Sequence, residues 1–109
     1  MIVKHYTDVP AAPAVEGQDI TIRWLISRPE GAPNFAMRLF ELQPGASSPH
    51  HRHAEEHEVF ILAGQGQVEE DGRFHPIAAG DFVFVPPDET HQFTNTGQEV
   101  LRFICVIPL

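Results

Sequence analysis

Residues 45–64 decide the fold of this chain and read GASSPHHRHAEEHEVFILAG. Four of the chain's seven histidines lie in this stretch, just before an apolar run that ends at a glycine. Neutral imidazole is a common ligand of divalent first-row metals. Side chains at i and i+2 of an extended segment share a face, so His51 and His53 pair as candidate ligands while His50 points elsewhere. The stretch predicts a metal site at the start of a strand.

Short apolar or alternating segments lie on both sides of this stretch, separated by proline and glycine turns. The expected strands cover residues 20–26, 35–42, 58–63, 65–70, 73–77, 82–85, 90–94 and 100–107. Residues 35–42 have the propensity for a short helix, but the flanking prolines favour a strand. Asp71-Gly72 predicts a tight hairpin, because both central residues of the favoured turn need positive φ. The pattern predicts an all-β sandwich or barrel.

The length of 109 residues predicts one domain over residues 1–109. Residues 1–19 are expected to form an N-terminal arm or edge strand, with residues 2–6 as the strand candidate. The formal net charge of −8 disfavours nucleic acid and anionic membrane surfaces as partners, because both are negatively charged and bind clusters of Lys and Arg. No apolar run approaches a membrane span, no signal sequence is evident, and the single Cys105 cannot form an internal disulfide. We therefore expect a cytoplasmic protein.

Two motifs with defined spacing follow each other in this chain. In the first, Gly45 is followed by five residues, a His-x-His pair, a ligand position and a glycine at position 64. In the second, Gly80 precedes Pro86, and a histidine and an asparagine follow at positions 91 and 95. Both motifs occur in order over residues 45–95, and together they resemble the two motifs of the cupin family. The resemblance implies a single-domain cupin fold, which is a double-stranded β-helix or jelly-roll barrel.

The chain departs from the family pattern at two positions. The glycine expected after the proline of the second motif is Asp88, which tolerates left-handed backbone better than most residues. The family's acidic ligand lies seven residues before the closing glycine, and this position holds His57. Glu58 comes one residue later, and a shift of one residue moves a side chain to the opposite face of a strand. We expect His57 to point inward, with Glu58 as the alternative ligand.

The resemblance therefore implies a metal held by His51, His53, His57 and His91, as in a subgroup of very small bacterial cupins. Manganese is the expected metal, and Fe, Ni, Cu and Zn also suit imidazole ligands. Without a carboxylate ligand the 2+ charge stays uncompensated, so the site favours anionic substrates, peroxide or hydroxide. Glu55 and Glu56 are expected to form a solvated rim, and either could hydrogen-bond a ligand imidazole.

Four further residues are candidates for the substrate site. Arg38 shares the parity of Phe40 and Leu42, so it is either an inward cation that steers an anionic substrate or a surface residue. Phe93 follows His91 by two residues, and Phe103 and Cys105 share a parity on the last strand. These three are expected to line the cavity, and the alternative for each is ordinary core packing. Cys105 could be a reactive thiol near the metal, and the alternative is an inert buried thiol.

The first functional hypothesis is a metal-dependent, dioxygenase-type oxidoreductase acting on a small organic substrate. The second is an isomerase or lyase in which the metal polarises a carbonyl. The third is a module that binds a small molecule or the metal without turnover. A shared fold does not select a reaction. The resemblance also implies a homodimer, in which residues 2–6 could extend a partner's sheet.

Overall fold

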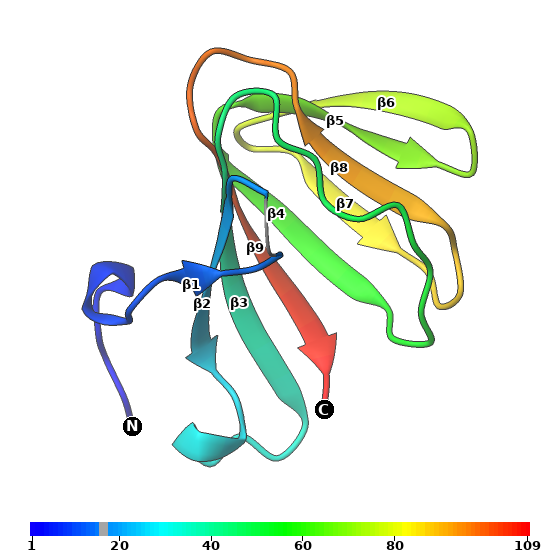
Figure 1. The fold of residues 1–109 in the computed structure, drawn as a ribbon. Helices are drawn as coiled ribbons and strands as arrows, with labels where there is room; N and C mark the ends of the chain where they lie inside the picture. Colours follow the sequence, from blue (N-terminus) through cyan, green and yellow to red (C-terminus); the bar gives the residue numbers. More distant parts are fainter. Residues whose placement is uncertain (16–17) are drawn as a thin grey trace.

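The computed structural model describes residues 1–15 and 18–109, which form two facing β-sheets (Figure 1). The strands are β1 (Ala12–Pro13), β2 (Ile20–Ile26), β3 (Phe35–Leu42), β4 (His57–Ala63), β5 (Gln65–Glu70), β6 (Arg73–Ala78), β7 (Phe82–Val85), β8 (His91–Asn95) and β9 (Leu101–Pro108). One sheet has the order β1-β2-β3-β9-β4-β7 and the other β6-β5-β8. All pairs are antiparallel.

Helix is limited, in the described residues, to two single 3-10 turns, η1 (Tyr6–Asp8) and η2 (Arg28–Glu30). Neither has the length and apolar character that a membrane crossing requires. The predicted all-β fold is therefore confirmed, and the helix considered for residues 35–42 is the strand β3.

Turn chemistry explains why the expected strands end within about one residue of the observed ones. Asp71 and Gly72 have φ of 46° and 88°, so the turn between β5 and β6 has the positive φ at both positions that the sequence predicted. Asp88 has φ of 65°, which confirms that it takes the place of the family's glycine. Gly64 has φ of 88°, and a Cβ there would collide with the Val100 carbonyl. Only glycine fits this turn.

The prediction for the N-terminus was wrong in one respect. Residues 2–5 are not a strand, and Tyr6 begins η1, in which the His5 side chain accepts from the Thr7 N–H. The edge strand is instead β1, in which Ala12 lies opposite Ile22 of β2. β-forming residues near the N-terminus have no neighbouring strand to pair with, so propensity alone does not make them extended. Glu16 and Gly17, part of the expected arm, lie outside the described residues.

The core fills the space between the two sheets. On β4, His57, Val59 and Ile61 are buried while Glu58 and Phe60 are exposed, as the predicted alternation requires. Each fully buried aliphatic or aromatic side chain contributes about 1.5–3 kcal/mol relative to exposure. The alternation of β4 therefore fixes its register, and with it the inward direction of His57.

Candidate functional site

Four imidazole rings meet at one end of the space between the sheets. Three of them, from His51, His53 and His91, each offer a nitrogen within 4.8 Å of the nitrogens of the other two. The fourth ring joins through His53, because His57 Nε2 lies 2.6 Å from His53 Nε2. The ring centroids of His57 and His91 are 5.2 Å apart. The structure thus brings all four predicted ligands together from two strands and one loop.

Each histidine is positioned by its backbone. His57 is the first residue of β4 and is 8% exposed, while the neighbouring Glu58 is exposed. His91 begins β8 and pairs with His51 in an isolated antiparallel bridge. This bridge fastens the histidine-rich loop to the smaller sheet. His53 lies two residues further along that loop, with its ring centroid 5.1 Å from that of His51.

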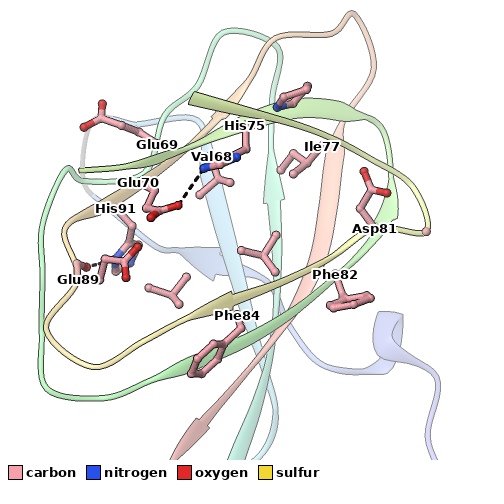
Figure 2. A pocket seen from close by; sticks show the side chains of 14 residues that line it. Val68, Glu69, Glu70, His75, Ile77, Asp81, Phe82, Phe84, Glu89 and His91 are labelled. Atoms are coloured by element: carbon pink, nitrogen blue, oxygen red, sulfur yellow. Dashed lines mark hydrogen bonds and ion pairs between the residues drawn. The ribbon is translucent and has the colours of Figure 1, made fainter. Parts of the chain in front are cut away.

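Backbone carbonyls determine which nitrogen of two rings is protonated. His53 Nδ1 lies 2.9 Å from the Glu55 carbonyl, and His91 Nδ1 lies 2.9 Å from the Glu89 carbonyl (Figure 2). A carbonyl only accepts, so each Nδ1 carries the proton and each Nε2 keeps a free lone pair. Glu55 was expected near a ligand ring, and both its carbonyl and its carboxylate lie near His53 Nδ1, the carboxylate oxygen at 3.5 Å. Sequence patterns gave no signal for Glu89, because any residue type supplies the same carbonyl.

The ring of His57 is held differently from the others. Its Nδ1 lies 3.0 Å from Cys105 Sγ and 3.3 Å from Arg38 Nη2, and Arg38 Nη2 donates to the same sulfur over 3.1 Å. Arginine is a donor only, so His57 Nδ1 either accepts from Arg38 or, when protonated, donates to the sulfur. In the first tautomer the Nε2 proton of His57 faces His53 Nε2, and in the second the Nε2 lone pair of His57 is free to bind a metal.

The electrostatics favour the neutral form of three of these rings. Burial, with the nearby His53 and Arg38 acting in the same direction, lowers the pKa of His57 to about 3. Burial also lowers the pKa of His51 and of His91. Burial raises the pKa of the Cys105 thiol, against the influence of Arg38. Neutral imidazoles with converging lone pairs are the donor set that a divalent first-row metal requires, so these residues fit such an ion.

A cavity of about 510 Å³ opens beside the histidines. Its apolar walls come from both sheets and include Ile20, Ile22, Trp24, Phe40, Leu42, Phe93 and Phe103. Phe103 stacks on Phe93 and on Phe40, with ring centroids 4.9 and 5.5 Å apart. Arg38, Phe93, Phe103 and Cys105 all line this cavity, as predicted, while their roles stay predictions. Trp24 was missed, although its parity with Ile20 and Ile22 could have shown it.

The other three histidines lie outside the cluster. His50 bonds Glu69, His75 Nε2 lies 2.9 Å from Glu70, and His5 Nδ1 lies 2.7 Å from Thr7. His75 and Glu70 lie in a second cavity of about 500 Å³ between β5, β6 and β7, which is rich in carboxylates (Figure 2). Of the four clustered histidines, only His91 borders both cavities.

Comparison with known proteins places these features in a family. The model of the cupin domain family matches residues 38–107, a span that includes all four clustered histidines. The polyketide cyclase RemF from Streptomyces resistomycificus has a similar solved structure, with a TM-score of 0.90 and 34% sequence identity. The superposition covers 99% of this chain and 79% of RemF.

Curated relatives have diverse names. The oxalate-binding protein of Thermotoga maritima is 42% identical over 76 residues, which are 66% of this chain and 63% of that protein. The dimethylsulfoniopropionate lyase DddW of Ruegeria pomeroyi is 36% identical over 105 residues, which are 91% of this chain and 68% of that protein. The alignments therefore span about two thirds of these relatives' own length.

Proposed function

The chain belongs to the cupin family, and on this premise we propose that it is a metal-dependent enzyme acting on a small organic substrate. One observation carries the proposal: four imidazoles converge beside a largely apolar cavity. His51, His53, His57 and His91 would hold one divalent first-row metal. Manganese is the metal expected from the family resemblance, and Fe, Ni, Cu and Zn are compatible with the same ligands.

The reaction that we favour is non-redox. When bound, the metal would supply a Lewis acid that polarises a carbonyl or stabilises an enolate. Two relatives with substantial coverage are named as a cyclase and a lyase, which supports this class over an oxidative one. The wall of the cavity contains no carboxylate among the described residues, and its four histidines are the proposed metal ligands, so proton transfer there would depend on the thiol or on solvent.

The residues of this chain would contribute binding and orientation. Phe93 and Phe103 would hold the apolar part of a substrate, and Arg38 would supply a positive charge on the same wall. Cys105 would act through His57, because its sulfur lies within hydrogen-bond distance of the His57 ring. We therefore propose Cys105 as a positioning residue.

A dioxygenase-type oxidoreductase is the second candidate. It is favoured by the ligand set itself, because four neutral imidazoles leave the metal charge uncompensated and available to anionic reactants such as peroxide. The two reactions differ in their demand on the metal, since zinc cannot change its oxidation state.

Metal exchange tests the proposal. The purified protein is stripped with a chelator, reloaded with Zn, Mn or Fe, and screened against carbonyl compounds with and without oxygen. We expect anaerobic turnover with zinc comparable to that with manganese. Turnover that requires oxygen and is lost with zinc would establish the oxygenase instead. No turnover, together with a lower melting temperature after chelation, would indicate a binding module. The His50→Ala variant is the control, because its ring lies outside the cluster.

We also propose that two copies pair as a homodimer. The outer face of β4 and β7 carries Phe60, Phe82 and Phe84, which are 48%, 82% and 57% exposed. A contiguous apolar patch of this kind is typical of an interaction surface. A solution mass measured by light scattering should be that of a dimer, and a monomeric mass at micromolar concentration would contradict the proposal.

A further inference from the structure

Arg38 differs from the other arginines on the strands. Arg23 and Arg102 both pair with Glu41, over 3.6 and 2.9 Å, and Arg73 pairs with Glu70 over 2.6 Å. In residues 1–15 and 18–109, Arg38 has no carboxylate partner. Its hydrogen bonds use Nη2 alone, and they go to the neutral side chains of His57 and Cys105.

The surroundings of this guanidinium are apolar and aromatic. Its central carbon lies 5.5 Å from the ring centroid of Trp24 and 5.0 Å from that of Phe40. Its Nε is buried without a hydrogen-bond partner in the described structure. Aromatic faces attract a cation by roughly 0.5–2 kcal/mol, but they do not neutralise its charge. These contacts therefore hold the Arg38 side chain in place but leave its positive charge without a negative partner.

The side chains that line the cavity carry a positive charge with no negative charge to neutralise it. The described lining contains one arginine, four histidines and no carboxylate. A divalent metal on those histidines would add further positive charge. Partly buried charges are normally paired, because desolvating an unpaired ion costs several kcal/mol. An anion that enters the cavity would supply the missing partner.

The aromatic wall next to Arg38 indicates the shape of the uncharged part of that anion. Arg38 and Phe40 are two residues apart on β3 and share its inner face, and Phe40 lies opposite Phe103 on β9. From Phe40 a continuous stack runs through Phe103 to Phe93, with interplanar angles of 27° and 29°. Rings stacked on one another present their edges along the side of the stack, and ring edges pack against the face of a flat π-system better than against a bulky saturated body.

We propose that the substrate is a flat, conjugated organic anion whose charged group pairs with Arg38 and whose body lies along the Phe40–Phe103–Phe93 wall. This identifies the substrate class of the site described above, so its relevance to turnover rests on the proposed function. The contact with Arg38 itself requires no metal. Binding therefore tests it separately from catalysis.

The experiment is calorimetric titration of the purified protein, with and without its metal, using three probes. These are 2-naphthoate, which is flat and anionic, 2-naphthamide, which is flat and neutral, and cyclohexanecarboxylate, which is anionic but not flat. We expect naphthoate to bind at least about tenfold more tightly than either comparison compound, because only naphthoate combines a charged group for Arg38 with a flat body for the aromatic wall. The preference for naphthoate over naphthamide should persist in metal-free protein.

Variants assign the effect to one side chain. Arg38→Gln should bind naphthoate and naphthamide equally, Arg38→Lys should keep part of the preference, and Arg73→Gln, altered outside this cavity, should behave as the unmodified protein. Equal binding of the two flat probes by the unmodified protein would overturn the proposal, as would a preference that survives in a folded Arg38→Gln protein. Anion binding without any metal-dependent turnover would leave this inference standing and remove the proposed enzymatic function.

Discussion

His51 and His91 face each other across a bridge of two backbone hydrogen bonds. The N–H of His91 donates to the His51 carbonyl over 3.0 Å, and the N–H of His51 donates to the His91 carbonyl over 3.3 Å. Their ring centroids are 5.2 Å apart. This bridge is one of several backbone contacts that join the two motifs, and it brings together two histidines separated by some forty residues of sequence. The proposed metal site would depend on it, because it holds two of the four proposed ligands side by side.

Removing a ligand at this bridge should weaken metal binding. We expect His91→Ala to lower metal affinity by at least the roughly 10–100-fold that is typical of losing a residue supporting a ligand. Competition with a chromophoric chelator measures the affinity. His50→Ala is the matched control, because His50 is adjacent to His51 and bonds Glu69 instead. Equal losses in the two variants would contradict the assignment.

The metal-free protein should lose stability on acidification. His57 is 8% exposed, and its pKa falls from 6.5 to about 3 in the folded chain. The unfolded chain then binds a proton at pH values where the folded chain does not, so the free energy of unfolding decreases as the pH falls from 6.5 towards 3. The stabilisation is fully present above pH 6.5. The loss should be on the order of a few kcal/mol.

Urea denaturation of the chelator-treated protein across this pH range measures the effect. His57→Asn lacks the titrating ring and should show a shallower decline, whereas His50→Asn, altered at an exposed ring, should keep the original one. A decline of the same steepness in all three proteins would assign the acid sensitivity to other groups.

The turn at Asp88 should tolerate glycine and reject a β-branched residue. Asp88 has φ of 65°, a conformation that Asp adopts at modest cost and valine only with strain. We expect Asp88→Val to destabilise the fold by about 1–3 kcal/mol and Asp88→Gly to be neutral or slightly stabilising. Thermal unfolding of both variants tests this, and an Asp88→Val protein as stable as the parent would show that the turn rearranges freely.

Two phenylalanines should differ in their effect on stability. Phe103 is 4% exposed and stacks on Phe93 and Phe40, whereas Phe82 is 82% exposed. Phe103→Ala should cost about 3–5 kcal/mol, and Phe82→Ala should change the stability of the isolated chain by less than about 0.5 kcal/mol. Chemical denaturation at low protein concentration compares them without contributions from association. Similar costs would contradict the inward direction of Phe103.

Most of the fold could be predicted because prolines, glycines and Asp-Gly mark the ends of short strands. The same alternation predicted the inward direction of His57, which the burial pattern of β4 confirms, and it left Arg38 either inward or on the surface. The cavity lining shows that Arg38 points inward. Residues 2–6 could not be predicted this way, since a strand needs a partner and propensity does not supply one. The exposed residues Ile2 and Val3 have the composition of a strand without the neighbour.

The contacts that orient the rings of the candidate metal site could not be predicted from side-chain patterns. The protonation of His53 and His91 depends on the carbonyls of Glu55 and Glu89, and every residue type has a carbonyl. The contact between Cys105 and His57 depends on the pairing of β4 with β9, in which Val59 lies opposite Cys105. Strand order of this kind follows from the three-dimensional fold, whereas alternation along each strand predicts only which side chains share a face.

The proposed four-histidine metal site is tested most directly by elemental analysis of two purified variants, His57→Ala and Glu58→Ala. The side chain of His57 is buried and reaches His53, while that of Glu58 is exposed on the opposite face of β4. Circular dichroism first establishes that both variants are folded. We predict that Glu58→Ala retains the metal content of the parent and that His57→Ala loses most of it. Metal loss in Glu58→Ala with retention in His57→Ala would contradict the four-histidine centre.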